Sequence, residues 1–182
     1  MKDKKAIEVC SHFALGDAAR KLLASELKAE EYLQLLIKNK QYVDAVRVLA
    51  YSLPTREAIV WANWCARQFS QQNPSDKSSA ALGAVEKWLA EPSDENRRAA
   101  MKAAELAEFG TPAGSAALSV FFSGGSIAPP DAPEVAPQEN LGPNAVVGTV
   151  LMAAVLKEPE HAEAKYQAFL AEGQRIAAGE SK

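Results

Sequence analysis

Two cysteines and two histidines are the side chains best suited to metal binding or nucleophilic catalysis. Cys10 and His12 form a Cys-x-His pair near the N-terminus, Cys65 stands alone, and His161 is far away in sequence. A structural metal site needs several ligands at matched spacing, and a catalytic cysteine needs an activated thiolate with a histidine beside it. The Cys10–His12 pair alone offers too few ligands, so we expect no metal site.

Cys65 lies on an apolar helical stripe. Ala58, Trp61, Ala62, Cys65 and Phe69 recur at the i, i+3, i+4, i+7 and i+11 spacing of one face of a helix. A thiol on that face is expected to be buried, which raises its pKa and makes it unreactive. We therefore interpret Cys65 as a small hydrophobic residue of the core.

The carboxylates and glycines form no catalytic motif. Glu158, Glu160 and His161 flank Pro159 at a predicted helix start, where acidic residues complement the helix dipole. Gly124-Gly125 lacks the lysine and the preceding strand of a phosphate-binding loop. No nucleophile elbow, kinase signature or zinc-protease motif is present either. We expect a protein that is not an enzyme and that takes no cofactor and no metal.

Residues 123–142 (SGGSIAPPDAPEVAPQENLG) predict a long loop, with four prolines, three glycines and no helical periodicity. Ordering a loop of this length costs entropy, and long loops in compact domains are usually functional or disordered. Proline lowers that cost by stiffening the chain, which suits a recognition segment. Alternatively, the loop packs on its own domain through Ile127, Val135 and Leu141 as apolar anchors.

The tryptophans are the second group of candidate contact residues. Their helical spacing predicts that Trp61 and Trp88 pack in the core, whereas Trp64, beside Asn63 and Arg67, could lie at an interface. The candidate partner-binding residues are Phe121, Phe122, Ile127, Pro129, Pro130, Asp131 and Trp64.

Arg97 and Arg98 follow the predicted helix cap Ser93 and the acidic residues Asp94 and Glu95. Arg98 and Asp94 are spaced i, i+4, which is worth about 0.2–0.5 kcal/mol on a helix surface. We interpret this stretch as an exposed charge pattern of a first helical turn.

The remaining sequence patterns predict helices. Prolines separate the helical patterns, and Ser75, Ser93 and Thr111 stand where N-caps are expected, with Gly110 as a left-handed helix stop. The fold class is all-α: a compact domain of about eight or nine helices in antiparallel hairpins, with one long Pro-rich loop. The predicted helices are 29–39, a segment ending before Pro54, 55–72, 75–91, 93–109, 112–122, 143–157 and 159–178.

Length and charge restrict the function classes. The 182 residues predict one domain, 1–182, with a flexible N-terminus over 1–15 and a frayed tail over 177–182. A net charge of -3 leaves no basic surface for nucleic acid. The longest apolar stretch has 12 residues, short of the roughly 20 that span a bilayer. Two cysteines suit a reducing compartment, so we expect a cytoplasmic protein without membrane insertion.

Three stretches resemble a known family: DAVRVLA (44–50) with LPTREA (53–58), AVEKWL (84–89) with SDENRRAA (93–100), and TPAG (111–114) with FSGGS (122–126) and the prolines at 129–130. The family comprises small bacterial proteins catalogued as a domain of unknown function and encountered among type VI secretion genes. The likeness covers about residues 29–156. Where family members commonly carry a Trp-Trp pair, this chain has Val60-Trp61. The resemblance implies a secretion-related setting and no catalytic residues.

These observations favour a non-enzymatic interaction protein, an adaptor or accessory factor of type VI secretion that binds a protein partner through Phe121–Pro137. A second hypothesis is an immunity protein that neutralises a toxin, since residues 57–182 carry a net charge of -6. The third is a small enzyme that uses Cys10 and His12, or the neighbourhood of Glu158 and His161.

Overall fold

The computed structural model of the protein describes residues 4–180. Within this range the chain is all-helical, as predicted, with ten α-helices and one short 3-10 helix, η1. No helix in the described range is both long and apolar enough to cross a bilayer. The helices are α1 (Ala6–Cys10), α2 (Asp17–Leu22), α3 (Ala29–Lys38), α4 (Tyr42–Ser52), α5 (Thr55–Gln72), α6 (Asp76–Ala90), α7 (Asp94–Ala107), α8 (Pro112–Phe121), α9 (Leu141–Val155), η1 (Pro159–His161) and α10 (Ala162–Ala177).

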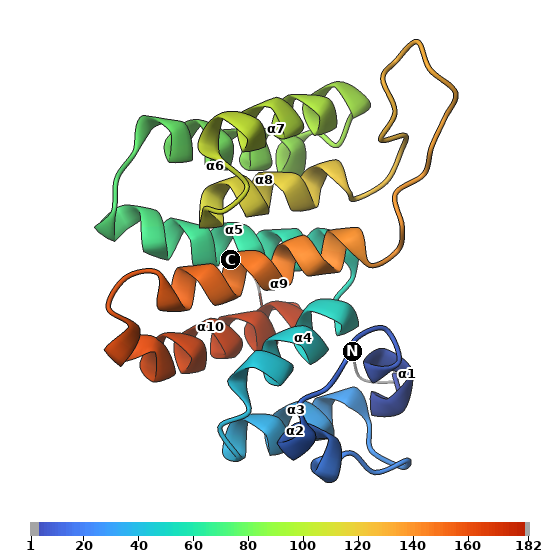
Figure 1. Ribbon diagram of the computed structural model, residues 1–182, viewed down its shortest axis with the longest axis vertical. Helices are drawn as coiled ribbons and strands as arrows, with labels where there is room; N and C mark the ends of the chain where they lie inside the picture. Colours follow the sequence, from blue (N-terminus) through green and yellow to red (C-terminus); the bar gives the residue numbers. More distant parts are fainter. Residues whose placement is uncertain (1–3, 181–182) are drawn as a thin grey trace.

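The helices stack in layers along the longest axis of the molecule. Figure 1 shows α6, α7 and α8 at one end, α5 and α9 in the middle, then α10 with α4, and α1 to α3 at the other end. Neighbours in sequence pack against each other as hairpins, among them α3 with α4, α5 with α6, and α7 with α8. The segment between α8 and α9 projects beyond these layers (Figure 1).

Local signals explain most helix starts. The Ser93 hydroxyl accepts a hydrogen bond from the Asn96 backbone N–H at 3.2 Å, and Thr111 caps α8 in the same way through Gly114 at 3.0 Å. Ser75 occupies the N-cap position of α6, as expected, but its side chain does not make the capping hydrogen bond that the sequence predicts.

The end of α7 differs from the prediction. Glu108, rather than Gly110, has a positive φ, of 67°, and its ψ of 131° lies outside the left-handed helical region. The Thr111 hydroxyl donates to the Glu108 carbonyl at 2.8 Å. Gly114 lies so close to that carbonyl that a Cβ on Gly114 would overlap with its oxygen. The end of α7 is therefore set by its contacts with the start of α8, and not by Gly110.

The N-terminal segment is ordered from residue 4 onward, where the sequence predicts flexibility over 1–15. Ala6 and Val9 of α1 are buried, and the Ala6 N–H donates to the Leu27 carbonyl at 2.9 Å. Burial of two apolar side chains and pairing with a second segment outweigh the absence of a strong helix signal. Residues 1–3 and, in the predicted frayed tail, 181–182 lie outside the described range; Ala177 is the last helical residue.

The core runs between the middle layers and is organised around Trp61, which is fully buried. Its indole N–H donates to the Phe169 carbonyl of α10 at 2.7 Å. Gly173 of α10 lies so close that a Cβ there would come within 2.8 Å of the Trp61 ring and 2.6 Å of Leu49. Trp88 is only partly buried and packs against the edge of this core.

Candidate functional site: the proline-rich loop

Residues 122–140, which connect α8 to α9, form the proline-rich loop, the feature that stands out from the helical layers (Figure 1). The Ile127 N–H donates to the Val135 carbonyl at 2.8 Å and closes the base of the projecting part. All residues from Pro129 to Ala136 are exposed. The two sides of the loop are thus joined at its base, and its outer part is not buried against any other described segment.

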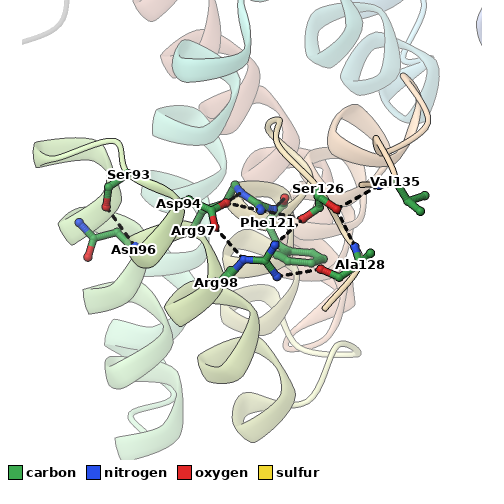
Figure 2. A network of polar contacts seen from close by, with 9 residues as sticks. All are labelled: Ser93, Asp94, Asn96, Arg97, Arg98, Phe121, Ser126, Ala128 and Val135. Carbon is green, nitrogen blue, oxygen red and sulfur yellow. Dashed lines mark hydrogen bonds and ion pairs between the residues drawn. The ribbon is translucent and has the colours of Figure 1, made fainter. Parts of the chain in front are cut away.

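Arg97 of α7 holds the start of the loop. Its side chain is buried, with the residue 4% exposed, and its guanidinium donates to the Phe121 carbonyl and the Ser126 carbonyl, each at 2.8 Å. The guanidinium carbon lies 4.9 Å from the centre of the Phe121 ring, a cation–π distance. Figure 2 shows these contacts between α7, the end of α8 and the loop.

Arg98 extends the same network further along the loop. It donates to the Ser126 carbonyl at 3.2 Å and to the Ala128 carbonyl at 3.0 Å. The Ser126 hydroxyl in turn accepts from the N–H groups of Ala128, at 3.1 Å, and Val135, at 3.0 Å (Figure 2). Both sides of the loop base are therefore tied to one helix through a single serine.

Asp94 orients the two arginines. Its carboxylate accepts from Arg97 at 3.0 Å and from Arg98 at 2.7 Å. Hydrogen bonds from Arg97 and then Arg98 lower the pKa of the Asp94 carboxyl below its usual range. Each guanidinium thus bridges a carboxylate on its own helix and carbonyls on the loop, a charge-assisted geometry stronger than neutral hydrogen bonds.

This network corrects the interpretation of Arg97 as part of an exposed charge pattern. Only the spacing to Asp94 was visible in the sequence, whereas the buried acceptors, the carbonyls of Phe121 and Ser126, lie 24 and 29 positions away. Backbone carbonyls occur at every residue and leave no trace in composition. The nearest available signal was the arginine pair itself, on a helix that precedes an unusual loop.

The structure separates the predicted contact residues of the loop into two groups. Phe121 is buried beneath Arg97, and Phe122 and Ile127 are half-buried, so these three support the loop. Pro129, Pro130 and Asp131 are exposed at its outer part. Of the residues considered as apolar anchors, Ile127 and Leu141 are partly buried, whereas Val135 is exposed. Polar bonds from α7 hold the loop in addition.

A cavity of about 300 Å³ opens at the point where the two ends of the loop meet the helices; we call it the neck cavity. The loop contributes one wall, which includes Phe122, Ser123 and Glu139. The opposite, helical wall comes from α4, α5 and α9 and includes Ile59 and Val146. The neck cavity is therefore continuous with the base of the loop.

Trp64 lies elsewhere. It is half-buried, its ring meets the Phe169 ring edge-on with centroids 5.9 Å apart, and it lines a separate depression of about 310 Å³ with Phe69 and His161. The structure does not bring Trp64 together with the loop residues, since the two depressions share no lining residue.

The cysteines are placed as buried groups. Burial, followed by the charge of Asp44, raises the pKa of Cys10 to about 11. Cys65 is fully buried, as predicted, and burial raises its pKa as well. Among residues 4–180 no three His, Cys, Asp or Glu side chains gather closely enough to hold a metal ion.

Comparison with known proteins places the chain in a family. The model of the family of unknown function DUF6931 matches residues 32–177, most of the chain, and the protein belongs to that family. The match includes α7, α8 and the whole proline-rich loop. No curated protein and no solved structure matches the chain.

Proposed function

We propose that this member of DUF6931 is a non-enzymatic protein-binding protein whose proline-rich loop contacts the partner. In the secretion-related setting implied by the sequence resemblance, it acts in the cytoplasm as an adaptor or accessory factor of a type VI secretion system. Its role is to present a surface, and its helical layers serve as the rigid support for that surface.

The observation that carries the proposal is the contrast between the two parts of the loop. The base is fixed by the buried guanidinium of Arg97, whereas the outer part, from Pro129 to Ala136, is exposed. A buried arginine side chain loses conformational entropy and solvation on folding, so its use to fix an otherwise solvent-exposed segment calls for a reason. Presentation of that segment to a partner supplies one.

Stiffness supports the same function. Four prolines restrict the backbone of residues 122–140, and Arg97, Arg98 and Ser126 fix the base. A segment that is already ordered loses less conformational freedom on binding, so more of the contact energy contributes to affinity. Extended proline-containing segments are used in protein recognition for this reason.

The test replaces Ile127–Pro137 with a Gly/Ser linker of equal length and compares affinity purification with mass spectrometry from the native host. Leu106→Ser is the matched control, since Leu106 is an exposed apolar residue outside the loop, 66% exposed. Circular dichroism and a thermal melt are used to check that both variants fold.

We expect a secretion component to be recovered with the unmodified protein and with Leu106→Ser, and to be lost with the loop replacement. Recovery of the same proteins with all three chains overturns the proposal. Recovery of a toxin that is lost with the loop keeps the loop as the binding surface but assigns the protein the role of an immunity protein.

A further inference from the structure

We infer that the partner contacts the loop with a basic segment that carries one large apolar side chain, and that this side chain enters the neck cavity. The inference rests on the proposed function and deepens it, because it specifies the chemistry of the partner and adds a second part to the binding surface. Two independent features support it: the shape of the neck cavity and the charge of the loop.

The neck cavity suits one apolar side chain. Its volume of about 300 Å³ lies at the small end of the roughly 300–1,000 Å³ of ligand sites. Apolar lining comes from Phe122, which is partly buried, and from the almost fully buried Leu53, Ile59 and Val146, beside the polar residues Thr55, Ser123, Gln138 and Glu139. Large side chains that fill such a pocket at the centre of an interface contribute most of the binding energy.

The neck cavity and the loop form one surface. Phe122 and Ser123 at the start of the loop, and Pro137 and Glu139 at its end, all line the cavity. A partner segment that follows the loop toward its base therefore reaches the cavity without leaving the surface. One partner segment can therefore contact both the loop and the cavity.

The loop supplies the complementary charge. Residues 122–140 contain Asp131, Glu134 and Glu139 and no lysine, arginine or histidine. All three residues are exposed, and none of the ion pairs within residues 4–180 involves them. A partner with lysine or arginine is attracted to this face, and the attraction falls as salt increases.

Two basic residues neighbour the helical wall of the cavity without lining it. Lys4 donates to the Tyr51 carbonyl at 3.5 Å, and Arg56 follows Thr55 at the start of α5. Arg97 and Arg98 are engaged by Asp94 and by loop carbonyls. The basic groups of the partner segment should therefore face the loop side of the cavity.

The test is a selection of phage-displayed random peptides on the full-length protein, with each selected peptide then measured as a synthetic, labelled probe. Ser123→Phe fills the neck cavity from a partly exposed position with no side-chain hydrogen bond to a described residue. Thr55→Trp fills it from the helical wall, in case the first variant disturbs the loop. Ser79→Phe adds an aromatic ring at an exposed position of α6 outside the cavity and is the matched control.

We expect selected peptides to contain an aromatic or long aliphatic residue next to lysine or arginine. Either cavity-filling variant should weaken their binding by about tenfold or more, the effect of removing a central anchor, and Ser79→Phe should leave it unchanged. Asp131→Asn with Glu134→Gln should weaken binding at low salt and remove most of its salt dependence.

Three outcomes overturn the inference. The selected peptides are acidic or uncharged, their affinity is the same for both cavity-filling variants as for the unmodified protein, or no peptide is enriched over a carrier protein. Concentration-dependent self-association lost in Ser123→Phe also overturns it, because the occupant is then a second copy of this chain. The proposed function fails separately, if the native partner is still recovered after loop replacement. A native partner lost with the loop but retained by both cavity-filling variants refutes only the inference.

Discussion

The guanidinium of Arg97 donates to the carbonyl of Ser126, 29 positions later in the chain, at 2.8 Å. This partly buried bond joins helix α7 to the proline-rich loop. The same guanidinium also holds the Phe121 carbonyl, so one side chain fixes both the end of α8 and the path by which the chain leaves it. Arg97 is therefore one of the residues that hold the loop base, together with Arg98 and Ser126.

Replacement of Arg97 should be the most damaging single change at the loop base. Arg97→Ala leaves the Phe121 carbonyl without its donor in a buried place, and we expect a loss of about 2–4 kcal/mol in the free energy of unfolding. Arg97→Lys restores a charge but not the planar fork, and should recover only part of the loss. Urea denaturation measures both.

Arg98→Ala is the control for Arg97, because Arg98 is more exposed and does not bind the buried Phe121 carbonyl, although it shares Asp94 and the Ser126 carbonyl with Arg97. We expect it to cost about 1 kcal/mol or less. Equal losses for Arg97→Ala and Arg98→Ala would contradict the central role of the buried guanidinium.

A side chain at Gly125 should destabilise the loop base. Its φ is +65°, and a Cβ would lie 3.0 Å from the Arg97 guanidinium nitrogens. We expect Gly125→Ala to cost about 1–2 kcal/mol from backbone strain and crowding together. It should also speed amide hydrogen exchange at Ala128 and Val135, whose N–H groups bind Ser126. Gly110→Ala is the control, since nothing lies within 4 Å of a Cβ there and its φ is not positive.

The Asp94 carboxylate should stabilise the fold at neutral pH and lose this effect in acid. The pKa of this carboxyl is lowered in the folded protein below the ordinary value of 3.8 by bonds from Arg97 and Arg98. A lowered folded-state pKa stabilises the fold above the unfolded-state pKa, and the stabilisation disappears as pH falls through the folded-state pKa. The difference in melting temperature between the unmodified protein and Asp94→Asn should therefore be constant above about pH 5 and shrink below it. A difference that stays constant down to pH 2 would refute the role of the carboxylate charge.

Gly173 should be required by the core. A Cβ there would come within 2.6 Å of Leu49 and 2.8 Å of Trp61, both of which are fully buried. We expect Gly173→Ala to destabilise the protein by about 1–3 kcal/mol through overpacking. Gly83→Ala, in the exposed middle of α6 with open space around its Cβ, should instead stabilise by about 0.5–1 kcal/mol. Thermal melts of the two variants should shift in opposite directions.

Backbone conformation was predictable wherever the cause is local. The expected helix over 55–72 matches α5, Thr55–Gln72, and Ser93 and Thr111 cap the helices that follow them. The expected loop over 123–142 ends two residues later than the structure has it, because Leu141 already begins α9. Proline spacing, capping hydroxyls and apolar periodicity act within a few residues, so the sequence displays them directly.

Contacts between segments that are far apart in the sequence could not be predicted from local patterns. The residues alone predicted an all-helical chain, one proline-rich loop and a buried Cys65. Only the packing of α7 against α8 brought Arg97 to the carbonyls of Phe121 and Ser126, and only the meeting of the loop ends with α4, α5 and α9 made the neck cavity. The physical reason is that backbone carbonyls and cavities belong to no residue type, so they carry no sequence signal until the chain has folded.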